Sequence, residues 1–570
     1  MSASTCRRRE GRNRAWLALG LAVPFVALVL LVSPRGDFPL NDDWVYAKMV
    51  QALVDDGRFG TSPLANAFAL TQTLYAAPLV ELLGFSFTLL RLTTVFMGWV
   101  TVCFTAFTAR ELGLSNRNAV LAALTVFVNP LFINLSYTFM TDVPFCAFAS
   151  ISTFYFVRAL RSPTTANVLC GTLFSIAAYY ERQFGALIPL AFAAASVSHW
   201  RPLGPRRLAR AAMALAVPWA IALAAARALP APEIRVEAVA STASAGVRLF
   251  ELVMTAPPLA LFLGGIFVLP ISSCIVIDTL ARPTRDIGAR IAILPIAMIV
   301  ALTVWGPALY LLTFFGPHIL QFPISPGVGP HLFASLDATR QEGATVPSGA
   351  LAMVIGVLSC LSVGAAATVI AGTLFRRRAA QAPRMGAARF LFLLSLGLLV
   401  APGFAMSGPY FDRYLLPAVP PIALLAAMGL SWRPRRAAAM CAAVVFGGLV
   451  CYSVIGLQDY MAWNTARWQV IDALRIRHGV HDNEIDGGFE FNGMYTSDEY
   501  IRRLQDGQTI ARPKKWWVVG DAYIVLPLDH VPGRPEYEVV ESAPYYSWIG
   551  SETRHMYAMK RAVPDTAPTR

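Results

Sequence analysis

Long apolar runs alternate with short polar connections over most of the chain. A helix needs about 20 mostly apolar residues to span the hydrocarbon core of a bilayer. Thirteen runs have this character and predict transmembrane helices, at residues 16–33, 86–109, 118–135, 143–160, 166–180, 184–198, 212–230, 250–280, 291–313, 347–374, 389–408, 414–431 and 437–456. We interpret the first run as an uncleaved helix, because no clear small-residue cleavage site follows it.

Basic residues mark every second connection between these runs. Lys and Arg accumulate in short cytoplasmic loops of membrane proteins. The pattern starts with the cluster of Arg7, Arg8 and Arg9 and ends with Arg435 and Arg436. We therefore expect a cytoplasmic N-terminus, and an odd number of helices then places the tail outside. The Arg-rich and Ala-rich composition favours a bacterial inner membrane, with the tail in the periplasm.

Composition agrees with a polytopic membrane protein. Of 570 residues, 56% are hydrophobic and 14% are charged, with a mean hydropathy of +0.54, whereas soluble domains contain about 25% charged residues. The net charge of +13 comes largely from the cytoplasmic connections. We attribute it to topology and anionic-lipid contact, and no basic patch interleaved with aromatic residues points to nucleic acid. The eight cysteines avoid the external loops, so neither disulfides nor a zinc site are expected.

The chain divides into three predicted parts: a cytoplasmic arm at 1–15, a transmembrane region at 16–456 and a periplasmic soluble α/β domain at 457–570. The fold class is thus an all-α polytopic membrane protein with a small C-terminal α/β domain. Within that domain we expect a helix near 466–478. Strand-like patterns follow it at 516–525, 537–541 and 555–560.

Two external regions are long enough to hold structure, the loop at 34–85 and the tail from 457, and a third external loop has the composition of connections that line sites. The loop at 34–85 contains the mixed segment 65–83, which suits one or two helices along the membrane surface. The loop at 314–346 is rich in Pro and Gly, a composition typical of mobile connections that gate sites.

Few ionisable residues fall at the outer ends of the predicted helices. They are Asp42, Asp43, Asp142, Arg182 and Arg413. A single acid in an external loop is most often only solvated, and an outer-face arginine can reach lipid headgroups instead of binding an anion. Charges placed at membrane depth, however, usually face a cavity and mark a substrate path. Because four separate loops contribute these residues to one side of the membrane, we expect them to converge on a site.

Carboxylates and guanidiniums on one membrane face suit group transfer from a lipid phosphate. A carboxylate can act as general base for an acceptor hydroxyl, and a base opposite the leaving group gives inversion, by analogy with inverting glycosidases. Arg stabilises the phosphate that departs, and a second carboxylate can hold the acceptor or tune the base. This chemistry requires no cofactor, although the sequence does not exclude a divalent cation.

Short motifs around these residues resemble those of GT-C membrane glycosyltransferases, specifically protein O-mannosyltransferases and the lipid A aminoarabinose transferase. The run 42–46, Asp-Asp-Trp-Val-Tyr, is similar to their Asp-Glu-x-x-Tyr signature in the first external loop, with Asp43 in place of Glu. Run 413–417, Arg-Tyr-Leu-Leu-Pro, resembles their Arg-Tyr-x-x-Pro element. Asp142 corresponds to an acid at the outer end of the fourth helix, and Glu-Arg-Gln at 181–183 lies where relatives carry a basic residue, usually Lys. The tail segment 486–493, Asp-Gly-Gly-Phe-Glu-Phe-Asn-Gly, resembles a glycine and aromatic motif of some bacterial relatives.

The resemblance implies an inverting, mannosyltransferase-like enzyme that moves a sugar from a polyprenyl-phosphate donor to a lipid, glycan or protein acceptor. Asp42 would be the catalytic carboxylate, assisted by Asp43 and Asp142. Arg182 and Arg413 would hold the donor phosphate, with Tyr46, Gln183 and Tyr414 in support. The sequence leaves three other classes open. They are a secondary transporter or lipid flippase, whose polar residues would lie near the bilayer midplane, a surface-polysaccharide polymerase or ligase, and a nonenzymatic scaffold.

Overall fold

The fold is described from a computed structural model of the full chain. It covers residues 3–562 with the exception of 63, 66, 200–203, 230–259, 282–291, 304–348, 376–381, 406–411, 431–435, 507, 509–516, 528–536 and 549. The external loop predicted at 314–346 therefore lies outside the described residues.

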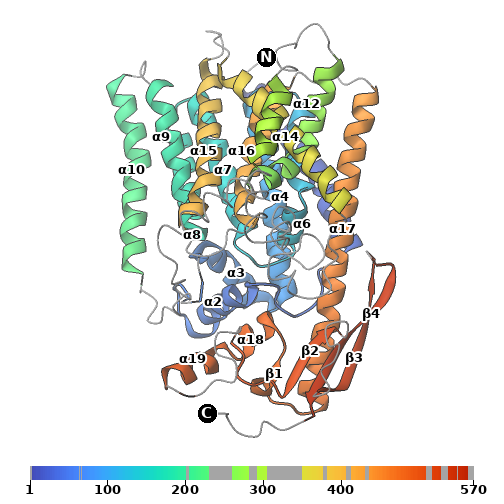
Figure 1. The fold of residues 1–570 in the computed structure, drawn as a ribbon. Helices are drawn as coiled ribbons and strands as arrows, with labels where there is room; N and C mark the ends of the chain where they lie inside the picture. The colour runs from blue at the N-terminus through green and yellow to red at the C-terminus, as the bar shows by residue number, and fades with distance from the viewer. Residues whose placement is uncertain are drawn as a thin grey trace.

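A bundle of apolar helices makes up most of the molecule (Figure 1). Its N-terminal half contains α1 (Ala3–Leu31), α4 (Phe87–Glu111), α5 (Asn116–Phe127), α6 (Pro130–Ser136), α7 (Asp142–Arg161), α8 (Thr165–Glu181), the 3-10 turn η1 (Gln183–Ala186), α9 (Leu187–His199) and α10 (Pro205–Ala228). The second half contains helices Ala260–Phe267 and Ala292–Thr303, α12 (Leu269–Ala281), α14 (Gly349–Phe375), α15 (Ala382–Ala405), the 3-10 turn η4 (Asp412–Ala418), α16 (Val419–Gly429) and α17 (Arg436–Asp472).

Each of the thirteen predicted runs overlaps a helix in the described part of the chain. Six described helices are long and apolar enough to cross a membrane, or eight if each of two sharply bent pairs counts as one span. The prediction of a helical, multi-pass membrane protein with a small C-terminal sheet domain is confirmed, whereas the number of spans stays a prediction.

The predicted span at 118–135 is not one continuous helix. Pro130 begins α6, and a proline disfavours helical geometry in the residue before it. The Asn129 side chain accepts hydrogen bonds from the N–H groups of Leu131 and Phe132, at 2.9 and 3.3 Å, and so caps the new helix. As a result α5 and α6 meet at an angle of 67°.

Ion pairs at the end of the bundle away from the sheet connect three helices. Glu111, at the end of α4, lies 3.3 Å from Arg14 in α1 and 3.3 Å from Arg161 at the end of α7. All three residues belong to the connections that the charge pattern assigns to the cytoplasm, so the structure brings those connections to one end. Figure 1 shows the sheet at the opposite end.

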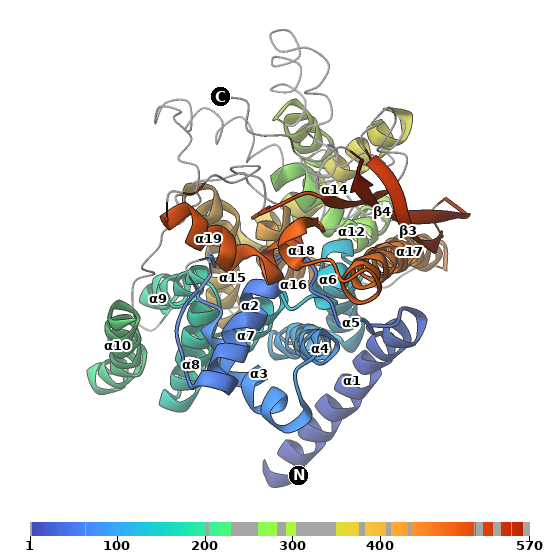
Figure 2. The ribbon, with the colours of Figure 1, turned by 90° about the horizontal axis from the view of Figure 1, so that it is seen from below.

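Two short helices cover the bundle on the side of the sheet. These are α2 (Asp43–Asp56) and α3 (Leu70–Leu83), and α2 ends at Gly57 in the left-handed conformation with φ 65°. The mixed segment 65–83 thus contains one of the expected surface helices. Figure 2, viewed from the sheet side, shows α2 beside α18 (Phe489–Tyr495) of the tail.

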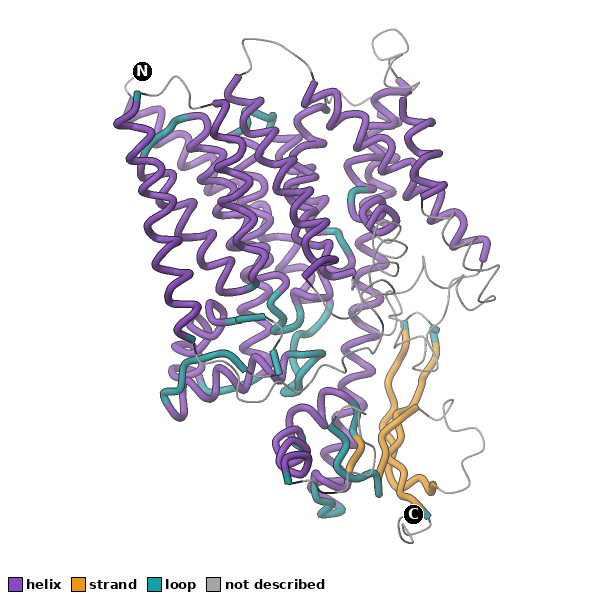
Figure 3. Tube along the Cα trace, turned by 60° about the vertical axis from the view of Figure 1, so that its left-hand side comes forward, coloured by secondary structure: helices purple, strands orange, loops and turns teal. Residues whose placement is uncertain are grey.

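The tail is a four-stranded sheet with short helices. Its strands β1 (Ile485–Asp486), β2 (Tyr523–Pro527), β3 (Tyr537–Ser547) and β4 (Glu552–Arg561) lie in the order β1-β2-β4-β3, and only the β1–β2 pair is parallel. The other described tail elements are the π turn η5 (Ala473–Arg477), the 3-10 turn η6 (Asp482–Glu484), α18 and α19 (Ser497–Gln505). The sheet packs against the lower part of α17 (Figure 3).

One prediction about the tail needs correction. The second strand begins at Tyr523 and not at 516, because Trp517 adopts a left-handed φ of 57° that an extended strand does not contain. The expected boundary at 457 falls inside a helix, since α17 continues from Arg436 to Asp472. The buried Asp459 of this helix accepts hydrogen bonds from the Ser547 hydroxyl at 2.7 Å and the Trp548 N–H at 2.6 Å. The membrane region and the tail therefore share one helix.

Candidate active site

Asp42 and Arg413 meet at the sheet-side end of the bundle although 371 positions separate them in the sequence. Asp42 precedes α2, and Arg413 lies in η4. The helix α16, which has proline in its first turn, follows η4 directly. An Arg413 Nη2 donates to Asp42 Oδ2 at 3.3 Å. The Asp42 side chain is 32% exposed and that of Arg413 is 14% exposed. The Asp42 side chain is therefore accessible to solvent, although its partner is largely buried.

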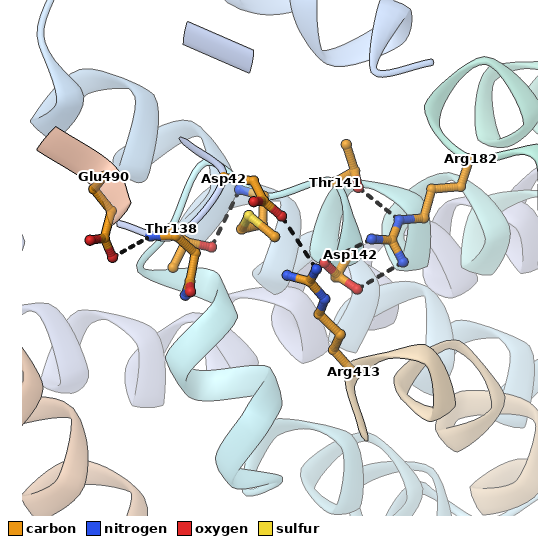
Figure 4. Close-up of polar contacts among 9 residues, drawn as sticks. Asp42, Thr138, Thr141, Asp142, Arg182, Arg413 and Glu490 are labelled. Carbon is orange, nitrogen blue, oxygen red and sulfur yellow. Dashed lines mark hydrogen bonds and ion pairs between the residues drawn. The ribbon is translucent and has the colours of Figure 1, made fainter. Parts of the chain in front are cut away.

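Asp142 and Arg182 form a buried pair beside the first. Arg182 Nη2 donates to Asp142 Oδ2 at 3.2 Å and Nη1 lies 2.9 Å from Oδ1, so the guanidinium and the carboxylate form a close ion pair. Arg182 Nε donates to the Thr141 hydroxyl at 2.7 Å. Asp142 is also the first residue of α7, where the helix dipole stabilises an anion. In Figure 4 the Arg413 guanidinium lies between the carboxylates of Asp42 and Asp142.

Asp43 is not part of this group of charges, and its carboxylate accepts hydrogen bonds from two backbone N–H groups. Its Oδ2 accepts from the Leu40 N–H at 3.2 Å and its Oδ1 from the Phe139 N–H at 2.8 Å. The side chain is fully buried. Burial raises the pKa of Asp43 to about 8, against the opposing effects of the two N–H groups and of Arg91. Asp43 thus joins the first external loop to the segment that precedes Asp142.

The three supporting residues differ in their placement. Tyr46 is buried, and burial raises the pKa of its hydroxyl. The negative charge of Asp42 raises this pKa further, and the positive charge of Arg182 lowers it. Tyr414 is buried and its ring lies 5.7 Å from the Arg182 guanidinium and 5.8 Å from that of Arg413. Gln183 is exposed at the start of η1. The structure therefore brings both tyrosines into the group of charges.

Several buried residues outside the sequence prediction hold the external loop on the bundle. Glu181, the last residue of α8, accepts from the Gln72 N–H at 2.9 Å, and the Gln72 amide donates to the Phe139 carbonyl at 3.3 Å. Arg91 of α4 is fully buried and donates to the carbonyls of three residues of the loop, which are Pro34, Gly36 and Phe38. An arginine inside an otherwise apolar run near its outer end was a signal for this role.

Taken together, Asp42, Asp142, Arg182, Arg413 and the two tyrosines form one site, which we call the acid–arginine cluster. Its four charged side chains come from the first external loop, α7, the α8–η1 junction and η4. Two negative and two positive charges lie side by side in a mostly buried setting. Within the described residues, no group of three or more His, Cys, Asp or Glu side chains has the arrangement of a metal site.

Comparison with known proteins gives one family match. Residues 72–225 match the family model described as dolichyl-phosphate-mannose-protein mannosyltransferase. The matched segment is well under half of the chain and contains Asp142 and Arg182, but neither Asp42 nor Arg413. No curated protein matches the chain significantly.

Two solved structures are similar along the length of the chain. They are crystal structures of ArnT from Cupriavidus metallidurans, one bound to undecaprenyl phosphate and one in the apo state. Both are 15% identical, cover 98% and 97% of this chain and 99% and 100% of their own, and have TM-scores of 0.39 and 0.37. TM-scores this low do not establish a shared fold. The family-model match confirms that the chain is similar to membrane glycosyltransferases of the GT-C superfamily.

Proposed function

We propose that this protein is an inverting glycosyltransferase that moves a sugar from a polyprenyl-phosphate donor to an acceptor hydroxyl on the periplasmic face of a bacterial inner membrane. The observation that carries the proposal is the contact between Asp42 and Arg413 at 3.3 Å. It places a candidate proton acceptor beside a candidate phosphate ligand, which are the two groups that such a transfer needs.

Asp42 acts as the general base in this proposal. It has the most exposed side chain among the charged residues of the cluster, whereas the side chains of Asp142 and Arg182 are 0% and 8% exposed. An acceptor hydroxyl can therefore approach Asp42 from the aqueous side. As the hydroxyl oxygen bonds to the anomeric carbon, its proton passes to the Asp42 carboxylate, and the bond from that carbon to the phosphate oxygen breaks on the opposite face.

Arg413 stabilises the phosphate that departs. Charge builds up on the phosphate oxygens as the bond to the sugar breaks, and a guanidinium can donate two hydrogen bonds to them. The Arg182 guanidinium already contacts Asp142 and Thr141. We therefore assign it chiefly to positioning the Asp142 carboxylate, whose negative charge contributes to the electrostatic potential at Arg413. Tyr46 and Tyr414 pack beside these charges and limit access of water to them.

The location of the cluster supports a lipid-linked donor. Asp142 begins α7, Arg182 follows α8 and Arg413 precedes α16, so each lies at the end of an apolar helix and not in its middle. A carrier with its chain in the bilayer presents its phosphate at this depth. A transporter site, in contrast, is expected near the bilayer midplane.

Purified protein in proteoliposomes tests the proposal. The protein is incubated with a panel of polyprenyl-monophosphate and polyprenyl-pyrophosphate sugars together with a membrane glycolipid extract, and release of the free carrier and the anomer of the product are measured. We expect release of polyprenyl monophosphate with inversion at the sugar carbon. Turnover of pyrophosphate-linked oligosaccharide alone would favour a polymerase or ligase. Movement of an intact lipid across the bilayer without sugar transfer would favour a flippase.

A further inference from the structure

The C-terminal tail reaches the proposed base through a backbone contact. The Asn41 N–H donates to Glu490 Oε1 of α18 at 3.2 Å, across 449 positions of sequence. Asn41 directly precedes Asp42 and has a φ of 55°. Residues other than glycine adopt this left-handed conformation infrequently, although Asn does so more readily than most. Because Asp42 directly precedes α2 at the N-cap position, the conformation of Asn41 sets the direction in which the Asp42 carboxylate points.

Glu490 is itself fixed by a buried arginine. Arg467 Nη1 lies 2.8 Å from Glu490 Oε2, and the two side chains are 6% and 10% exposed. The Arg467 guanidinium lies 4.9 Å from the ring centroid of Trp463 and 5.8 Å from that of Trp468, both on α17. The carboxylate therefore has one oxygen on Arg467 and the other on Asn41, so it links the long helix α17 to the loop that carries Asp42.

The local structure of segment 486–493 positions Glu490 next to the loop that carries Asp42. Asp486 Oδ1 accepts from the Asn492 side-chain amide at 2.9 Å and from the Gly488 N–H at 3.4 Å, which closes the turn before Glu490. At Gly493 a Cβ would lie 2.2 Å from the Trp44 ring of α2. Only a residue without a side chain allows α18 to approach α2 so closely.

We propose that Glu490, held by Arg467, is a positioning residue for sugar transfer, which it supports by fixing the backbone of Asn41 so that Asp42 faces Arg413. This inference rests on the proposed function of Asp42 as the base. Loss of the contact would release Asn41 from its left-handed conformation and turn Asp42 away. In the described part of the chain Arg413 pairs with Asp42 and Glu490 pairs with Arg467, so the Arg413 guanidinium would still bind the donor phosphate when Glu490 is lost. The inference thus predicts a loss in kcat at nearly constant KM for the lipid donor.

Kinetics of matched variants of the full-length protein test this split. In Glu490→Ala we expect kcat to fall by up to about 10²-fold, the size of effect that a small misplacement of a reacting group can have, with KM for the polyprenyl-phosphate sugar within about twofold of wild type. Glu490→Gln retains an Oε1 acceptor for the Asn41 N–H but turns an amide N–H donor toward Arg467, so its kcat should lie between those of Glu490→Ala and wild type. Equal losses in the Ala and Gln variants, or a rise in KM in place of the fall in kcat, would overturn the inference.

A control variant separates positioning from docking of the tail. Lys48 Nζ of α2 lies 2.9 Å from Asp498 Oδ2, which is a second contact between α2 and the tail that does not involve Asn41. Asp498→Ala should leave kcat unchanged. A loss in Asp498→Ala equal to that in Glu490→Ala would show that docking in general matters, and would overturn a specific role for Glu490.

Amide hydrogen exchange of the peptide around Asn41 gives a readout that does not depend on activity. We expect faster exchange at Asn41 in Glu490→Ala than in wild type, and no change in Asp498→Ala. Unchanged exchange in Glu490→Ala would overturn the inference even if kcat fell. If exchange rises as expected but the wild-type protein transfers no sugar, the contact is supported and the proposed function fails, so the two failures are distinguishable.

Discussion

The two ends of the helical bundle use arginine and acid in contrasting ways. At the end of the bundle away from the sheet, which we call the basic end, Glu111 pairs with Arg14 and Arg161. The side chain of Glu111 is 14% exposed and those of the two arginines are 25% and 39% exposed. At the sheet-side end, Arg182 and Asp142 pair with side chains that are 8% and 0% exposed. Exposed pairs contribute little to stability, whereas a buried charge is costly unless its partner is in place. The basic end thus follows the charge pattern of the sequence, whereas the Asp142–Arg182 pair at the opposite end is buried deeply enough that its cost indicates a role at the site.

The largest expected effect is at Asp42. Replacement by Asn keeps the size of the side chain but removes the ability to accept a proton. We expect kcat for sugar transfer to fall by about 10²–10⁴-fold, the usual contribution of a general base. Expression and melting temperature in detergent should remain close to wild type. Retention of most of the activity in proteoliposomes would remove Asp42 from its assigned role.

Arg413→Lys is expected to have the next largest effect. Lys keeps the positive charge but cannot donate two hydrogen bonds in a fork, and loss of one preorganised donor to developing charge costs about 10²–10³-fold in kcat. A steady-state assay with varied donor checks this. Activity equal to wild type would mean that charge alone suffices at this position.

Removal of one partner of the buried pair should affect stability most. Asp142→Ala leaves the Arg182 guanidinium buried without its carboxylate, which typically costs about 3–5 kcal/mol. Thermal unfolding in detergent, monitored by tryptophan fluorescence, should show a clear drop in melting temperature. An unchanged melting temperature would indicate that Arg182 finds water or another partner, and the contrast between the two ends would weaken.

The stability of the protein should depend on the ionisation of Asp43. Its pKa in the folded protein is about 8, above the ordinary value of 3.8, so the folded state binds the proton more tightly than the unfolded chain. This contribution is fully present below about pH 4 and is lost as pH rises through about 8. Melting temperatures measured from pH 6 to 9 should fall more steeply in wild type than in Asp43→Asn. Parallel curves would contradict this account.

The smallest effect is expected at the basic end. Glu111→Gln removes the charge that Arg14 and Arg161 share, and pairs with a solvent-accessible partner of this kind are worth about 0–1 kcal/mol. Activity should remain unchanged and the melting temperature should shift little. A loss of transfer activity comparable to that of the Asp42 variant would erase the distinction between the two ends.

The helices and the charged residues of the site could be predicted from the sequence, because apolar runs and isolated charges are local signals. The sequence also places Asp42, Asp142, Arg182 and Arg413 on one face through the alternation of basic connections. Their pairing could not be predicted, since Asp42 and Arg413 meet only after the whole bundle has packed.

Other features depend on distant contacts or on backbone conformation. The hydrogen bond from Phe139 to Asp43 joins residues 96 positions apart, and that from Asn41 to Glu490 joins residues 449 positions apart. No local pattern specifies either contact. The error in the start of β2 has a local cause, because Trp517 lies in an aromatic run but adopts a left-handed φ and packs its ring 5.0 Å from that of Trp44.

The most direct test of the central claim is an experimental structure of the protein with polyprenyl phosphate bound. We expect phosphate density within hydrogen-bonding distance of the Arg413 guanidinium, with the Asp42 carboxylate on the opposite side of the position that the sugar would occupy, and with the lipid chain leading into the membrane from the ends of α7 and α16. Phosphate bound among the arginines of the basic end, with Asp42 and Arg413 left in contact only with each other, would contradict it.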